Sequence, residues 1–186
     1  MNFCRILLFA FCLTAAYAQT PIHLIPQPVS VQPQTGLFAL TKTTSIEYNQ
    51  ADARVVADML SQRLNKPTGY ALAAKQGKAG KIQLNLNATP NTQLGDEGYM
   101  LDASSKGVVI TANRPAGLFY GMQTLTQLLP KEIESKTAVS KTWSLPAVKI
   151  TDYPRFGWRG IMLDVSRNFF TKEEVKQYID QLAKLK

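Results

Sequence analysis

Alternation of apolar and polar residues predicts three strands in the middle of the chain. The stretch Lys81–Asn87 alternates strictly, so one side of this strand is expected to be buried and the other to face water. Residues 98–103 and 107–112 are also strand-like, and the short segment between them suits a hairpin. Two shorter strands are predicted at 37–40 and 44–48. The proline-rich segment 19–37 suits an extended sheet edge.

Two stretches have the period of amphipathic helices. The first runs from about Ala51 to Asn65, and the second begins near Pro115 and ends at Pro130. On the second helix, Gly117 and Gly121 leave one side bare, so another element can pack closely there. The predicted apolar face of the first helix consists of Val55, Val56, Met59, Leu60 and Leu64. The order of strands and helices predicts a small α+β domain, with the helix pair covering one face of the sheet.

The last part of the chain has a different pattern. Residues 70–80 are interpreted as an exposed loop and residues 131–149 as a connection, with a domain boundary near Pro146. The run 160–165 is apolar except for Asp164, which suits a strand buried on both faces. A helix follows, and Thr171 and Glu174 have the spacing of a capping box. Together they predict one βα unit, which cannot bury its own strand without further units.

The N-terminus predicts an exported protein. One positive charge precedes the apolar run Ile6–Ala16, and Ala16-Tyr17-Ala18 fits a cleavage site, so residues 1–18 are interpreted as a signal peptide. Both cysteines lie within it, which leaves the rest of the chain without disulfides. No later apolar run is long enough to span a membrane, so we expect no membrane insertion after cleavage and a periplasmic or secreted location.

The distribution of charged and metal-ligating residues argues against a nucleic-acid partner and against a metal site. The formal net charge is +8, but the basic residues are scattered singly, which favours a solvated basic surface over a nucleic-acid partner. His23 is the only histidine, and no cluster of cysteine, histidine and carboxylate accompanies it, so a metal site is not expected.

Three charged residues near the predicted last strand are candidates for a site. Arg159 follows Trp158, and a guanidinium can bind two sugar hydroxyls while an indole packs on a sugar face. Asp164 and Arg167 lie close by in sequence. From spacing alone, a structural ion pair among the three is favoured over a binding site, because buried charges are usually paired.

Four segments carry a resemblance to a known family: residues 25–28, 97–101, 115–125 and 154–167. In this order they resemble the β-N-acetylhexosaminidases of glycoside hydrolase family 20. The resemblance implies an α+β N-terminal domain over residues 19–150. It also implies the start of a (β/α)8 TIM barrel over residues 151–186, where the chain would hold only the first strand and helix.

The family's activity is hydrolysis of terminal non-reducing N-acetylhexosamine from β-linked glycans, by a retaining mechanism in which the substrate's own acetamido oxygen attacks the anomeric carbon. The resemblance implies no cofactor and no metal, and a catalytic Asp-Glu pair on a later barrel strand, so this chain alone is expected to be an inactive N-terminal portion. It assigns Arg159 to sugar binding, with Asp164 and Arg167 as weaker candidates. The family usually has histidine where this chain has Asn168.

Two acidic pairs are not interpreted as catalytic. Asp96-Glu97 precedes a strand of the small domain, and Glu173-Glu174 lies at a helix N-terminus, where capping explains it. Two other functions stay open at this point. One is a different barrel glycosidase with a similar first domain, such as an α-glucuronidase. The other is a non-catalytic carbohydrate-binding domain.

Overall fold

The computed structural model describes residues 22–186, and the predicted signal peptide lies outside them. Residues 30–152 form one mixed sheet of seven strands in the order β1-β7-β5-β6-β4-β2-β3. The strands are β1 (Ser30–Leu40), β2 (Ile46–Tyr48), β3 (Ala74–Gln76), β4 (Ile82–Leu86), β5 (Tyr99–Ser104), β6 (Gly107–Ala112) and β7 (Trp143–Asp152). Pairing is antiparallel from β1 to β6 along this order and parallel from β6 to β3.

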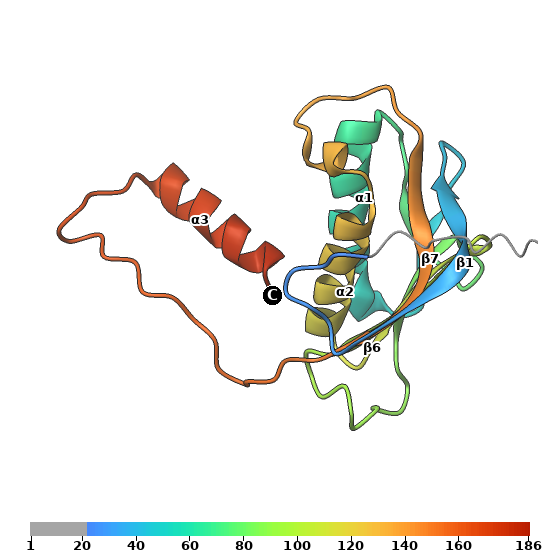
Figure 1. The fold of residues 1–186 in the computed structure, drawn as a ribbon, viewed down its shortest axis with the longest axis horizontal. Helices are drawn as coiled ribbons and strands as arrows, with labels where there is room; N and C mark the ends of the chain where they lie inside the picture. Colours follow the sequence, from blue (N-terminus) through green and yellow to red (C-terminus); the bar gives the residue numbers. More distant parts are fainter. Residues whose placement is uncertain (1–21) are drawn as a thin grey trace, which may run out of the picture.

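Helices α1 (Arg54–Thr68) and α2 (Pro115–Leu128) lie side by side on one face of this sheet (Figure 1). Two short 3-10 helices, η1 (Ala51–Ala53) and η2 (Lys131–Glu134), flank them. The core lies between the helix pair and the sheet, and the alternate residues of β4, β5 and β6 that face the helices are buried. The predicted α+β domain, with two helices covering one sheet face, is therefore observed.

The bare side of α2 is the side that meets the sheet. A Cβ atom added to Gly117 would lie 2.2 Å from the carbonyl oxygen of Gly98, and one added to Gly121 would lie 2.4 Å from Cγ2 of Ile110. Both distances are far inside van der Waals contact, so α2 reaches its position only because these residues have no side chain. The close approach expected from the sequence is confirmed.

We expect Gly121→Ala to lower the free energy of unfolding by about 1–3 kcal/mol, because the added methyl group overpacks the contact with Ile110. Thermal unfolding followed by circular dichroism measures the effect. Gly157→Ala is the matched control, since an added Cβ there meets nothing within 4 Å. Equal melting temperatures for Gly121→Ala and the unmodified protein would contradict this account of the packing.

Two segments expected to be irregular are strands. The supposed connection 131–149 contains the start of β7, which pairs with both β1 and β5 inside the sheet. Pro146, expected at a domain boundary, lies within β7 opposite Leu37, beside an irregularity in the β1 pairing. The supposed loop 70–80 contains β3, which pairs in parallel with β2 at the sheet edge. In both places, pairing with a distant strand outweighs the local signal of proline, glycine and lysine.

The predicted apolar face of α1 is only partly buried. Val56, Leu60 and Leu64 are buried, as expected. Val55 is 67% exposed and Met59 is 41% exposed, so these two residues of the predicted face lie outside the core. The apolar pattern of α1 is therefore wider than the surface that the sheet covers.

After β7 the chain leaves the sheet. Residues 153–171 form no strand, and the expected strand at 160–165 is not observed. A strand needs a hydrogen-bonding neighbour, and none lies beside this segment among residues 22–186. The segment leads to α3 (Lys172–Lys184), which lies on the helix side of the domain (Figure 1).

The predicted capping box of α3 is confirmed. The Thr171 side chain accepts a hydrogen bond from the backbone N–H of Glu174, and the Glu174 carboxylate accepts one from the backbone N–H of Thr171. The latter hydrogen bond is the main cause that lowers the pKa of Glu174. No residue of α3 is fully buried. Within residues 22–186, no helix has the length and apolar character needed to cross a membrane.

Candidate functional site

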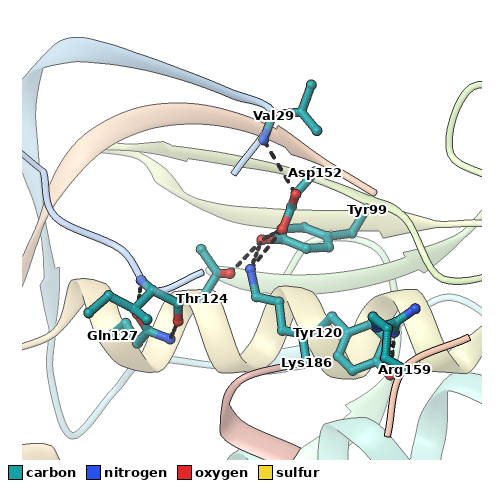
Figure 2. A network of polar contacts seen from close by, with 9 residues as sticks. Val29, Tyr99, Tyr120, Thr124, Gln127, Asp152, Arg159 and Lys186 are labelled. Carbon is teal, nitrogen blue, oxygen red and sulfur yellow. Dashed lines mark hydrogen bonds and ion pairs between the residues drawn. The ribbon is translucent and has the colours of Figure 1, made fainter. Parts of the chain in front are cut away.

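Arg159 links the segment after β7 to the α+β domain. Its Nη1 atom lies 3.0 Å from Oε2 of Glu97 and donates to the carbonyl oxygen of Phe156 at 2.8 Å. Its Nη2 atom lies 3.4 Å from the hydroxyl of Tyr120, and the guanidinium lies 6.0 Å from the centre of that ring (Figure 2). The hydrogen bond to Glu97 raises the pKa of Arg159 above its usual value. The guanidinium is therefore charged and already engaged.

Asp164 and Arg167 form the ion pair that the spacing favours, and Arg159 does not join it. Nε of Arg167 lies 2.5 Å from Oδ2 of Asp164, whose other oxygen accepts from the backbone N–H groups of Ser166 and Arg167. These hydrogen bonds, first that of the Arg167 backbone, hold the pKa of Asp164 below its usual value. The Arg167 side chain is 86% exposed, so this pair organises a local turn at the surface.

A second polar cluster, which the sequence did not reveal, surrounds Asp152 at the end of β7. Its Oδ2 atom lies 2.8 Å from Nζ of Lys186 and 3.2 Å from the hydroxyl of Tyr99, which in turn lies 2.5 Å from Oγ1 of Thr124 (Figure 2). The side chains of Asp152 and Lys186 are 13% and 10% exposed. Burial raises the pKa of the Tyr99 phenol. The cluster thus joins β5, β7 and α2 to the end of α3.

Arg159 with its partners and the cluster around Asp152 border the same cavity. It has a volume of about 350 Å³, and its lining includes Glu97, Tyr120, Asp152, Phe156 and Arg159. The segment before β1 forms another wall, held on α2 by Gln127, whose amide exchanges two hydrogen bonds with the backbone of Ile25 (Figure 2). The cavity therefore lies at the junction between the α+β domain and the segment that follows it.

The two acidic pairs that were not interpreted as catalytic, Asp96-Glu97 and Glu173-Glu174, make structural contacts. Asp96 lies 3.5 Å from Arg114, Glu97 binds Arg159, Glu173 lies 3.5 Å from Lys176 and Glu174 caps α3. Among residues 22–186, no group of three or more histidine, cysteine, aspartate or glutamate side chains has the arrangement of a metal site.

Family comparison identifies the class of protein. Residues 21–153 match the family model described as glycosyl hydrolase family 20, domain 2, and residues 156–186 match the model of the family's catalytic domain. The first match alone covers most of the chain, so the protein belongs to glycoside hydrolase family 20, as its sequence segments indicated.

Known relatives agree with this assignment. The chain is 34% identical over 191 aligned residues to a β-hexosaminidase of Porphyromonas gingivalis, covering 98% of this chain and 24% of that protein. It is 30% identical to a β-N-acetylhexosaminidase of Cellulomonas fimi, covering 89% of this chain and 33% of the relative. The structure superimposes on the Streptomyces plicatus N-acetyl-β-hexosaminidase in complex with Thio-NAglucal with a TM-score of 0.83 and 44% identity, covering 89% of this chain and 33% of that one. The chain thus spans about a quarter to a third of the length of these relatives.

Proposed function

We propose that this chain is the N-terminal portion of a β-N-acetylhexosaminidase, which removes terminal non-reducing N-acetylhexosamine from β-linked glycans. The observation that carries the proposal is the pair of adjacent family matches, domain 2 followed at once by the start of the catalytic domain. In this proposal, residues 156–186 supply the first strand and helix of a TIM barrel. Residues 160–165 form that strand only when a neighbouring strand provides hydrogen bonds.

The proposed mechanism is the family's substrate-assisted one, with retention at the anomeric carbon. The substrate's acetamido oxygen attacks the anomeric carbon, and an adjacent Asp-Glu pair on a later barrel strand orients the amide and transfers the proton. The only adjacent Asp-Glu pair in this chain is Asp96-Glu97, which lies in the α+β domain and forms ion pairs with Arg114 and Arg159. We therefore expect no catalysis from the present 186 residues alone.

Arg159 is the residue proposed to bind sugar hydroxyls. Its guanidinium presents several N–H donors in one plane, which suits two neighbouring hydroxyl groups. In the structure, Glu97 and the Phe156 carbonyl accept from it, so sugar binding requires the sugar to replace these acceptors. Asp164 and Arg167 are weaker candidates, because each already satisfies the other at an exposed turn.

Grafting tests the proposed function. Residues 22–186 would replace the equivalent segment of the Streptomyces plicatus enzyme, which the chain matches at 44% identity. We expect the graft to release the chromophore from a p-nitrophenyl N-acetyl-β-glucosaminide, and the isolated 186-residue chain to release none. A correctly folded but inactive graft, or turnover by the isolated chain, would contradict the proposal.

Arg159→Ala in the active graft is expected to lower kcat/KM by about 10- to 100-fold, since hydrogen bonds from a charged donor contribute about 1.5–3 kcal/mol. Arg54→Ala is the matched control, because Arg54 lies exposed on α1, pairs with Asp58 and does not line the cavity. Steady-state kinetics on both variants measures the difference. Equal kcat/KM values for the two variants would remove Arg159 from the proposed site.

Export is also part of the proposal. The charged start, apolar run and cleavage pattern of residues 1–18 support a signal peptide, and the substrate class is compatible with an extracytoplasmic enzyme. N-terminal sequencing of the protein recovered from its source tests this, with Gln19 as the expected first residue.

A further inference from the structure

The second face of the sheet carries a row of side chains, polar except for Val109, that the proposed hydrolysis does not use. Strand register places Glu47, Gln83, Val109, Asp102 and Lys149 next to one another on β2, β4, β6, β5 and β7. In β4, β5 and β6 these positions alternate with buried ones that face α1 and α2. Among residues 22–186, α1 and α2 lie on the opposite face, so the row from Gln83 to Lys149 faces solvent, whereas Glu47 at its end is buried (Figure 1).

One end of this face is hollowed. The hollow has a volume of about 660 Å³, within the range of about 300–1,000 Å³ typical of small-ligand sites. Its floor is the part of the row formed by Gln83, Val109, Asp102 and Lys149. Its rims are the irregular part of β1 at residues 34–35 and the turn between β5 and β6 at residues 104–106. Two separate chain segments therefore border a floor of fixed sheet geometry.

The charge of the hollow is positive. Its only carboxylate is that of Asp102, which lies 3.6 Å from Nζ of Lys149. Lys81 and Lys106 also line the hollow, and no carboxylate of residues 22–186 lies within ion-pairing distance of either ammonium group. The charges of Asp102 and Lys149 cancel, whereas those of Lys81 and Lys106 have no partner carboxylate among residues 22–186. A ligand that brings negative charge meets complementary charge here.

The remaining lining favours a sugar as the carrier of that charge. Amide and hydroxyl groups are supplied by Gln34, Thr35, Gln83, Ser104 and Ser105, and these groups can both donate and accept hydrogen bonds. No aromatic side chain lines the hollow, so nucleic-acid bases have no ring to stack on and a protein partner finds no aromatic anchor pocket. The small apolar surface of Val109, which is half-buried, can contact the C–H face of a sugar ring.

We propose that this hollow on the open sheet face binds an acidic oligosaccharide, with Lys81 and Lys106 contacting its sulfate or carboxylate groups and Gln83 contacting its hydroxyls. The site is separate from the cavity that contains Arg159, since the two share no lining residue. It gives the α+β domain a binding function of its own, independent of whether the proposed hydrolysis is correct.

Isothermal titration of the full chain tests the proposal with three probes: a chondroitin sulfate hexasaccharide, a hyaluronan hexasaccharide that carries carboxylates only, and neutral chitohexaose. We expect at least one of the two acidic probes to bind and chitohexaose to bind at least about tenfold more weakly. The acidic probes distinguish sulfate from carboxylate as the recognised group. Absence of binding by both acidic probes, or equal affinity for chitohexaose, would overturn the proposal.

A charge-matched pair of variants locates the binding. The double variant Lys81→Glu and Lys106→Glu is expected to lose about tenfold or more in affinity for the acidic probe. The control, Lys42→Glu with Lys136→Glu, makes the same change in net charge at two exposed lysines outside the hollow. Circular dichroism verifies that both variants fold. An equal loss in the two would show diffuse attraction to a basic protein and would overturn the assignment to the hollow.

Discussion

Replacing Trp143 with alanine is expected to lower the free energy of unfolding by about 3–5 kcal/mol, the usual cost of deleting a large buried aromatic side chain. Trp143 is 1% exposed and pairs with Leu40 where β7 meets β1. Its loss removes apolar burial and leaves a cavity that a sheet edge can fill only in part. Since small domains have only about 5–15 kcal/mol of stability in total, the variant should unfold at a much lower urea concentration.

The chain contains its own control for this experiment. It has two tryptophans, and the second, Trp158, is 93% exposed. Trp158→Ala is expected to change the free energy of unfolding by less than about 0.5 kcal/mol. Acrylamide should quench the fluorescence of the Trp143→Ala protein, which retains only Trp158, more strongly than that of Trp158→Ala. Similar stability of both variants would mean that β7 is not part of the folded core.

Deleting residues 155–186 is expected to raise the yield of soluble monomer several-fold at a given protein concentration. The deleted part exposes large apolar side chains, and exposed apolar surface of this extent promotes association. The most exposed are Phe156, Trp158, Ile161, Met162 and Phe169, with exposed fractions of 64%, 93%, 62%, 92% and 87%. The deletion leaves all seven strands and both covering helices intact. Sedimentation and size-exclusion chromatography measure the monomer fraction.

A longer deletion is the matched control. Removing residues 143–186 also removes β7, which joins β1 to the rest of the sheet, and should yield an insoluble or unfolded product. The contrast places the end of the independently stable domain after β7, near residue 152. Equal or lower solubility after the short deletion would contradict the view that the segment after β7 is the source of association.

Several elements follow from local pattern because their burial is regular. Strict alternation in β4 and the hairpin of β5 and β6 allowed their placement to within about a residue. The capping box at Thr171 and Glu174 involves only neighbours in sequence, so its contacts needed no tertiary information. The same holds for the ion pair of Asp164 and Arg167, three residues apart. The glycine spacing in α2 predicted the close contact, though not its partner.

Other elements depend on partners that are distant in sequence. Strand β7 contains Pro146 and has no clean alternation, and it is a strand because β1 and β5 provide hydrogen bonds on its two sides. Val55 has an apolar side chain on the predicted face of α1, yet it is 67% exposed while its neighbour Val56 is buried. Residues 160–165 have the composition of a buried strand and form none, because no neighbouring strand is present in the described chain.

In the candidate sites, too, some features follow from the local sequence and others depend on residues that are distant in sequence. Motif resemblance identified the family and singled out Arg159 without any coordinates, because both rest on the order of residues along the chain. Its contact with Glu97, 62 residues away, could not be predicted, nor could the cluster of Asp152, Tyr99 and Lys186. The hollow on the open sheet face likewise arises only when the folded sheet and its turns bring Lys81, Lys106 and Lys149 to one surface. Local order specifies periodicity and motif, whereas the packing of distant strands decides which side chains meet.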